Sequence, residues 1–120
     1  MYVITKAWTF SAAHHLPWLD EGHKCRNVHG HNYRVTLAVG ANLLDEMGMV
    51  TDYANLAPFG DFIRARLDHR DLNDGVTAIQ PTAEALARYL YEAAVTLLPD
   101  VHIESVTVNE TDNTSAEYRP

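Results

Sequence analysis

The chain has 120 residues, of which 47% are hydrophobic, and these values predict one globular domain, residues 1–120, rather than a disordered chain. Nine basic residues against sixteen acidic ones give a formal net charge of −7, which argues against nucleic-acid binding and against attraction to an anionic membrane. No apolar run is long enough to span a bilayer and Met1–Lys6 has no signal-peptide pattern, so we expect a soluble cytoplasmic protein.

The first half of the chain predicts two long strands joined by a loop. Residues 2–14 are rich in β-branched and aromatic side chains, and residues 32–40 alternate apolar with polar ones, so both segments are expected to be strands. Residues 42–48 then predict a hairpin-like connection, and residues 49–51 a short return strand.

The second half predicts two helices followed by strands. Spacings of three and four residues predict a first helix whose apolar stripe is Leu56, Phe59, Ile63 and Leu67. A second helix is expected to begin near Pro81–Thr82 and to end at Pro99. Residues 103–109 predict a third main strand and residues 117–119 a short fourth. The order predicts an α+β fold, an antiparallel four-stranded sheet with two helices on one face.

Histidines are concentrated in one short segment, since five of the seven lie between positions 14 and 31. His29 and His31 flank Gly30 at the start of the second strand, where residues two apart point to the same side. If the first two strands form an antiparallel hairpin, His14 at the end of the first strand meets them. Three imidazoles with an open fourth position are typical of catalytic zinc, so His14, His29 and His31 are the predicted metal ligands.

Two alternatives to this metal site remain open at this point. The histidines could be ordinary loop and surface residues, because an isolated His-x-His pattern is short and common. His15 competes with His14 as third ligand, although its side chain should point to the opposite face of the strand. Cys25 is the only cysteine, which excludes an internal disulfide and a closed zinc site of thiolates.

Six short fragments in order make the chain similar to the 6-pyruvoyltetrahydropterin synthase family over nearly its whole length. They are Phe10–His14; Gly22–Cys25 with His29–Tyr33; Gly48–Tyr53; Leu67–His69 with Leu72–Asn73; Pro81–Glu84; and Asn109–Thr111. The resemblance implies the tunnelling fold, in which subunits join sheet edges into trimers and trimers stack into hexamers, with active sites between subunits. It also implies zinc (Zn²⁺) on His14, His29 and His31.

The same resemblance implies catalytic roles for four further residues. Cys25 matches the family's proton-accepting cysteine, Asp68 and His69 match its second catalytic pair, and Glu110 matches the acid that anchors the pterin ring. Each has a plainer alternative: a buried structural thiol for Cys25, a helix C-terminal histidine for His69 and a solvated charge for Glu110.

The substrate implied by the family is 7,8-dihydroneopterin triphosphate. Thr82 could help hold its ring or could simply cap the second helix. The local basic group of His23 and Lys24, with His15 and Arg26, could receive the triphosphate or could be a solvated loop.

The resemblance is strongest to the bacterial branch, which forms 6-carboxy-5,6,7,8-tetrahydropterin and releases acetaldehyde and triphosphate in 7-deazapurine (queuosine-type) biosynthesis. The compact spacing between Cys25 and His29 resembles this branch, whereas Glu110–Asn113 and Gly48–Val50 also resemble the pyruvoyl-forming enzymes. Two rivals are a pterin- or metal-binding module without turnover and a zinc hydrolase. The hydrolase ranks last, because no glutamate accompanies the histidines in an HExxH-like pattern.

Overall fold

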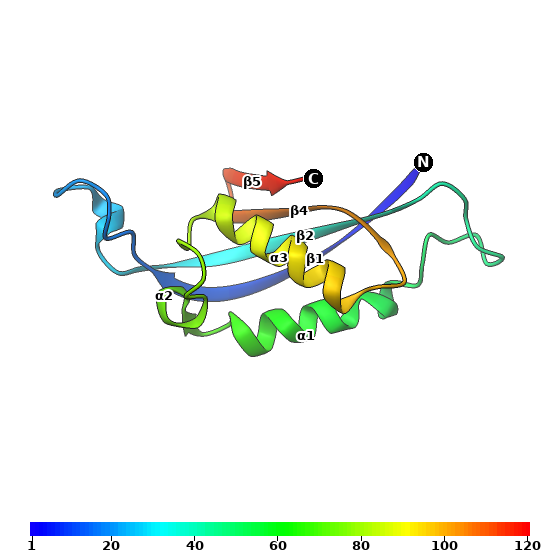
Figure 1. The fold of residues 1–120 in the computed structure, drawn as a ribbon, viewed down its shortest axis with the longest axis horizontal. Helices are drawn as coiled ribbons and strands as arrows, with labels where there is room; N and C mark the ends of the chain where they lie inside the picture. The colour runs from blue at the N-terminus through cyan, green and yellow to red at the C-terminus, as the bar shows by residue number, and fades with distance from the viewer.

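The protein is an elongated α+β structure of 56 × 24 × 24 Å, described here for residues 1–120 in a computed structural model (Figure 1). Its strands are β1 (Tyr2–His14), β2 (His29–Ala41), β3 (Arg70–Asp71), β4 (His102–Thr111) and β5 (Thr114–Tyr118). Its helices are η1 (Lys24–Arg26), η2 (Tyr53–Leu56), α1 (Ala57–Arg66), α2 (Leu72–Gly75) and α3 (Ala83–Leu97). No helix of this chain combines the length and the apolarity that a membrane crossing needs.

The five strands form one sheet in the order β3-β1-β2-β4-β5. The β1–β2, β2–β4 and β4–β5 pairs are antiparallel, and only β3 runs parallel to its neighbour β1. The long β1–β2 hairpin pairs every residue from Tyr2 with Ala41 to His14 with His29. This register without a bulge fixes which side chains meet at the end of the hairpin.

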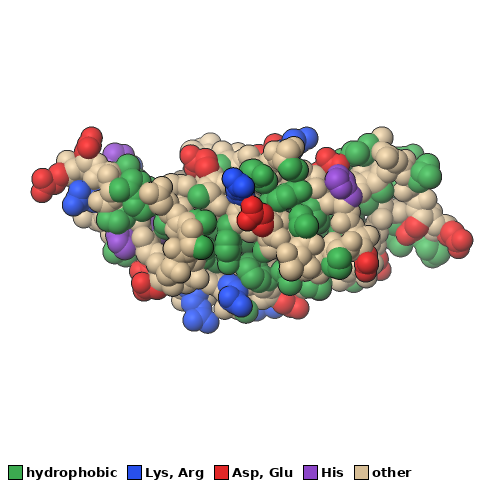
Figure 2. Space-filling view, viewed as in Figure 1, with side chains coloured by type: hydrophobic (Ala, Val, Ile, Leu, Met, Phe, Trp, Pro, Cys, Tyr) green, Lys and Arg blue, Asp and Glu red, His purple; other side chains and the backbone are tan.

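The helices cover one face of the sheet and leave the other face open (Figure 1). Alternate residues of the strands point into a core of 21 buried hydrophobic side chains, in which Tyr33, Val35, Leu37 and Val39 of β2 form the central row. The predicted stripe from Leu56 to Leu67 and the apolar face of α3 complete this core. Seen from the same side, Figure 2 shows hydrophobic side chains over the helical layer and acidic side chains at both tips of the molecule.

The predicted α+β class, the two main helices and the four main strands are confirmed, with three differences. The strand β2 begins at His29 rather than at residue 32, because the β1–β2 pairing continues through both histidines. The strand β3 and the one-turn helix α2 were not predicted, so the sheet has five strands and is mixed rather than four-stranded and antiparallel.

The predicted return strand at residues 49–51 is wrong. Asp45 closes a turn there instead, since its carboxylate accepts hydrogen bonds from the N–H groups of Met47 and Met49, both at 2.9 Å. The N–H of Asp45 in turn donates to the carbonyl of Met49 at 2.8 Å. These bonds curl the backbone and leave it no strand neighbour.

The helix α1 comes close to the sheet at Gly60, which lies against the indole of Trp8. A Cβ atom at Gly60 would clash with Nε1 and Cδ1 of Trp8. Trp8 also packs edge-on against Phe59, with ring centroids 5.3 Å apart. A residue without a side chain at position 60 is therefore what brings α1 down onto β1.

The substitution Gly60→Ala should lower the free energy of unfolding by about 1–3 kcal/mol, because the added methyl group overpacks the contact with Trp8. Urea denaturation followed by circular dichroism would measure the loss. Gly75→Ala is the matched control, since its Cβ would meet only a backbone oxygen at 3.5 Å. Trp8→Phe should relieve part of the loss; equal stability of Gly60→Ala and the parent chain would contradict the packing argument.

Candidate metal centre

Three histidines meet at the end of the β1–β2 hairpin, on the face covered by helices. His14 pairs directly with His29, and His31 follows two residues along β2 on the same face. Their ring centroids lie 4.5 Å (His14–His29), 5.1 Å (His14–His31) and 4.9 Å (His29–His31) apart. One ring nitrogen from each lies within 4.8 Å of the other two, and His14 is only 1% exposed. The structure therefore brings together the three predicted ligands.

Two of these rings are oriented by carbonyl groups behind them. Nδ1 of His14 lies 2.7 Å from the carbonyl oxygen of Pro81, and Nδ1 of His29 lies 2.7 Å from that of Asn27. A carbonyl only accepts, so each Nδ1 carries the hydrogen and each neutral ring has its lone pair on Nε2. The two Nε2 atoms face each other at 2.9 Å. Two lone pairs cannot bond to each other, so this arrangement fits a shared cation.

The surroundings of the third ring, His31, also favour its neutral form. Its Nε2 is buried without a hydrogen-bond partner. Burial lowers the pKa of His31, the nearby Glu110 carboxylate opposes this shift, and His14 and His29 add to it. A neutral imidazole offers a lone pair, and three such donors suit zinc and other transition-metal ions. These histidines therefore form a site that can hold a metal ion.

Tyr33 forms the inner wall of this site. Its ring stacks on Phe10 with centroids 4.8 Å apart and meets His14 and His31 edge-on at 6.0 and 5.5 Å. The residue is 1% exposed, yet its hydroxyl has no hydrogen-bond partner. Burial raises the pKa of Tyr33 and the charge of Glu110 raises it further, so the phenol stays protonated.

His15 lies outside the histidine cluster, which agrees with its opposite position on the strand. Its backbone is held instead by Asn73, whose side-chain amide accepts from the N–H of His15 and donates to its carbonyl, both at 2.9 Å. These two hydrogen bonds to α2 fix the point where the chain leaves β1. Asn73 belongs to one of the six family-like fragments, and no role was predicted for it.

Cys25 lies in the connection between β1 and β2, at the same end of the molecule as the histidines (Figure 1). It is half-buried on η1 and is not a member of the metal-binding group. Its carbonyl accepts from the N–H of Leu16 at 2.8 Å, which ties η1 to the end of β1.

The other basic residues of this connection have local contacts. Nδ1 of His23 accepts from the N–H of Cys25 at 3.1 Å and caps η1. Arg26 donates to the carbonyl of Leu19 at 3.0 Å, and Lys24 is exposed. In the predicted triphosphate-binding group, Lys24 is thus an exposed side chain with no bond inside the loop.

Asp68 and His69 form a clamp on the edge of β1, beyond the end of α1 at Arg66. The carboxylate of Asp68 accepts from the N–H of Ser11 at 3.0 Å, and the N–H of His69 donates to the carbonyl of Ser11 at 2.7 Å. His69 adopts a left-handed conformation with φ 58°, which is uncommon outside glycine. Nδ1 of His69 lies 3.0 Å from Oδ1 of Asp68, so the carboxylate orients the ring.

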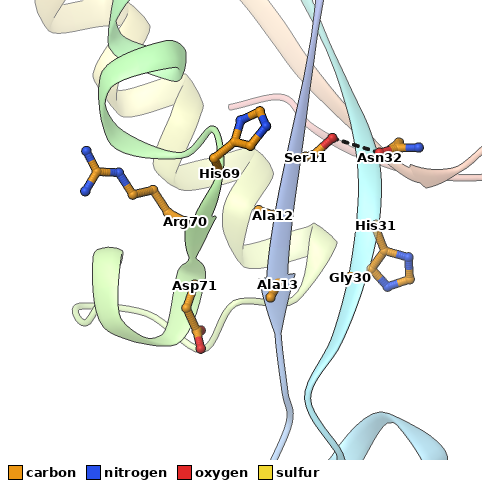
Figure 3. A pocket seen from close by; sticks show the side chains of 9 residues that line it. All are labelled: Ser11, Ala12, Ala13, Gly30, His31, Asn32, His69, Arg70 and Asp71. Atoms are coloured by element: carbon orange, nitrogen blue, oxygen red, sulfur yellow. Dashed lines mark hydrogen bonds between the residues drawn. The ribbon is translucent and has the colours of Figure 1, made fainter.

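An open groove of about 530 Å³ is lined by His69 to Asp71 and by residues of β1 and β2 that include Ser11, His31 and Asn32. Figure 3 shows the hydrogen bond from Ser11 to Asn32 across the β1–β2 pair, with His69 and His31 on opposite sides of that pair. Ala12, next to the clamped Ser11, pairs with His31. The clamp and the metal site are therefore connected through two adjacent residues of β1.

Glu110 lies at the other side of the metal site. Its Oε2 is 3.8 Å from Nε2 of His31, longer than a hydrogen bond. It also lines a cavity of about 470 Å³ with Glu84 and Glu117, two carboxylates that sequence reasoning did not assign. Thr82 is the N-cap of α3, where its Oγ1 accepts from the N–H of Ala85 at 3.2 Å.

Comparison with known proteins links this geometry to pterin enzymes. A family model described as 6-pyruvoyl tetrahydropterin synthase matches residues 3–120. The chain is 39% identical to a 6-carboxy-5,6,7,8-tetrahydropterin synthase of Synechocystis sp., with 98% of this chain and 93% of that protein covered. It is 31% identical to the human 6-pyruvoyl tetrahydrobiopterin synthase, with 97% and 90% covered.

The fold is also that of solved members of this group. The structure of Caenorhabditis elegans 6-pyruvoyl tetrahydropterin synthase matches with a TM-score of 0.87 and 28% identity, covering 99% of this chain and 95% of that one. The fold expectation drawn from the sequence is thereby confirmed.

The substitution Asp68→Asn should destabilise the chain at neutral pH but not in acid. The N–H of Ser11, followed by His69, holds the pKa of Asp68 below its ordinary value of 3.8, although partial burial opposes this. A lowered pKa means that the carboxylate stabilises the fold above 3.8 and that this contribution fades as the pH falls through the lowered value.

Urea denaturation of both chains at neutral pH and below pH 3.8 would test this. Asp61→Asn is the control, since Asp61 is 71% exposed and pairs only with Arg64 on the surface. A stability difference for Asp68→Asn that stayed constant across this range would show that the charge of Asp68 does not act in the clamp.

Proposed function

The chain belongs to the 6-pyruvoyl tetrahydropterin synthase family, and from this premise we propose that it is a zinc-dependent lyase that forms 6-carboxy-5,6,7,8-tetrahydropterin. Its substrate would be 7,8-dihydroneopterin triphosphate, with acetaldehyde and triphosphate released, in 7-deazapurine (queuosine-type) biosynthesis. The observation that carries the proposal is the pair of Nε2 lone pairs of His14 and His29, 2.9 Å apart beside the neutral His31. The higher identity to the Synechocystis relative than to the human one favours the carboxy-forming reaction.

His14, His29 and His31 would hold the zinc ion. Bound zinc supplies a Lewis acid that lowers the pKa of a hydroxyl on the substrate side chain and stabilises developing negative charge on its oxygen. The carbonyl groups of Pro81 and Asn27 keep two of the rings in the tautomer that a metal needs.

Proton transfer is assigned to Cys25 and to the Asp68–His69 pair. The thiol of Cys25 lies on η1, in the connection between β1 and β2, and the thiolate is the form of cysteine that accepts a proton. Since Nδ1 of His69 faces Asp68, Nε2 of His69 is left to take up or deliver a proton.

Substrate binding is assigned to the far side of the metal site. The Glu110 carboxylate can accept two parallel hydrogen bonds from the 2-amino and N3 positions of a pterin. Thr82 lies at the start of α3, next to the cavity that Glu110 and Glu84 share. Lys24 and His23 would meet the triphosphate at the exposed connection.

We further propose that the protein works in the cytoplasm as a homo-oligomer, a trimer or a hexamer. The strand β3 pairs only with Ala12 and Ala13 of β1, so most of that edge has free backbone groups, as has the outer edge of β5. Exposed edges of this length favour pairing with a second copy.

The second candidate is a 6-pyruvoyltetrahydropterin synthase, because relatives with that activity in their names reach 31–32% identity over 97% of the chain. A pterin- or zinc-binding module without turnover is the third candidate.

Incubating the protein with zinc and 7,8-dihydroneopterin triphosphate, then identifying the products by mass, distinguishes the three candidate functions. The 6-carboxy product with acetaldehyde is expected. A 6-pyruvoyl product, or no turnover with tight binding, would overturn the proposal.

The substitution Cys25→Ala should abolish turnover, by at least about a hundredfold as for the loss of a general base, while zinc content stays near that of the parent. Single-turnover product formation and metal analysis on the same sample would measure both. Val28→Ala is a control within the same connection, because Val28 is 64% exposed and has no assigned role. Normal turnover without the thiol would remove Cys25 from the mechanism.

Zinc removal should lower the thermal midpoint of the parent chain, because a ligand that binds only the folded state stabilises it. His29→Ala should lose this response, yet in chelator it should be no less stable than the parent, since the opposed lone pairs are gone. His102→Ala, at an exposed histidine on β4, should respond to zinc like the parent. Scanning calorimetry with and without chelator would show a zinc response in His29→Ala if the ligand assignment were wrong.

A further inference from the structure

The hydroxyl of Tyr33 is a buried polar group beside the metal site for which the proposed chemistry gives no use. Tyr33 is 1% exposed, and its hydroxyl has no hydrogen-bond partner. An unsatisfied buried hydroxyl is costly, whereas phenylalanine would fill the same stacked position against Phe10 at no such cost. The hydroxyl therefore needs an acceptor that comes close in a working state of the site.

A chemically suitable acceptor is the Glu110 carboxylate, because Glu110 follows Asn109, which pairs with Arg34 next to Tyr33. Oε2 of Glu110 lies 3.8 Å from Nε2 of His31, and the ring centroids of Tyr33 and His31 are 5.5 Å apart. The carboxylate is only 27% exposed, so it too has lost most of its water. A carboxylate accepts and a phenol donates, which makes the two groups chemically complementary.

A cation on the three histidines would bring them together. It would attract the carboxylate by charge, because Oε2 of Glu110 lies 3.8 Å from Nε2 of His31, one of the three ligands. The Tyr33 hydroxyl is a buried donor without a partner beside the same histidine. Hydrogen bonds from a donor to a charged acceptor are about twice as strong as neutral ones.

We propose that Tyr33 is a positioning residue: its hydroxyl donates a hydrogen bond to the Glu110 carboxylate when a divalent cation occupies the site of His14, His29 and His31. The bond would hold the carboxylate at a fixed place beside His31, where the proposed function needs it for the pterin ring. The inference rests on the proposed metal site, and it adds a link between metal binding and the orientation of the substrate-binding acid.

The test is a double-mutant cycle on zinc affinity with Tyr33→Phe, which removes only the hydroxyl, and Glu110→Ala, which removes the acceptor. Outer-shell partners of metal ligands typically contribute ten- to a hundredfold in affinity, so each single change should weaken zinc binding about tenfold. The double variant should be no weaker than Glu110→Ala alone, because both changes break one interaction. Competition with a chelator of known affinity measures all four proteins.

The stability of the metal-free protein, measured in the presence of a chelator, distinguishes a positioning role of the Tyr33 hydroxyl from a packing role. There Tyr33→Phe should unfold at the same urea concentration as the parent or a higher one, since the hydroxyl has no partner to lose. Tyr91→Phe is the matched control, a partly buried tyrosine of α3 that packs against Tyr118, and it should leave zinc affinity unchanged.

Additive effects of Tyr33→Phe and Glu110→Ala, or an equal loss of stability with and without zinc, would overturn the inference and leave the proposed function standing. A parent chain that binds no zinc would overturn both, and that result is read from the parent alone.

Discussion

The structure of the site depends on one close contact, the approach of the His14 and His29 rings across the end of the β1–β2 hairpin. The carbonyls of Pro81 and Asn27 take the only hydrogen that each neutral ring carries, so the facing nitrogens have no bond to offer each other. The fold nevertheless holds them at 2.9 Å, with His14 buried under the start of α3. A positive ion bound by both nitrogens would make this contact attractive.

The surrounding residues divide into layers around this contact. Tyr33 and Phe10 form an apolar wall inside, and Glu110 lies toward the acidic cavity on one side. The clamp of Asp68 and His69 on Ser11 lies on the other side and is linked to His31 through the adjacent Ala12. Because all of these groups attach to β1, β2 or β4, small changes in the pairing of these strands would move metal ligands and proton-transfer groups together.

The sequence predicted the parts of the site that follow from strand alternation. His29 and His31 point the same way because they are two residues apart, and His14 meets them because the hairpin has no bulge. The carbonyl partner of His14 comes from Pro81, 67 residues later, and every residue carries a carbonyl, so no side-chain pattern marks it. The left-handed backbone of His69 had no glycine to signal it, and the strand expected at residues 49–51 failed because Asp45 curls that segment by its own hydrogen bonds.

The close packing of Gly60 on Trp8 has a practical consequence. The indole of Trp8 is held between α1 and the sheet, whereas Trp18, the other tryptophan, is exposed in the connection that carries Cys25. Two intrinsic fluorophores therefore report on different regions of one small protein. The emission of Trp8 would follow the separation of helix and sheet, and quenching of Trp18 by solutes would follow the covering of the connection by a ligand or a neighbouring subunit.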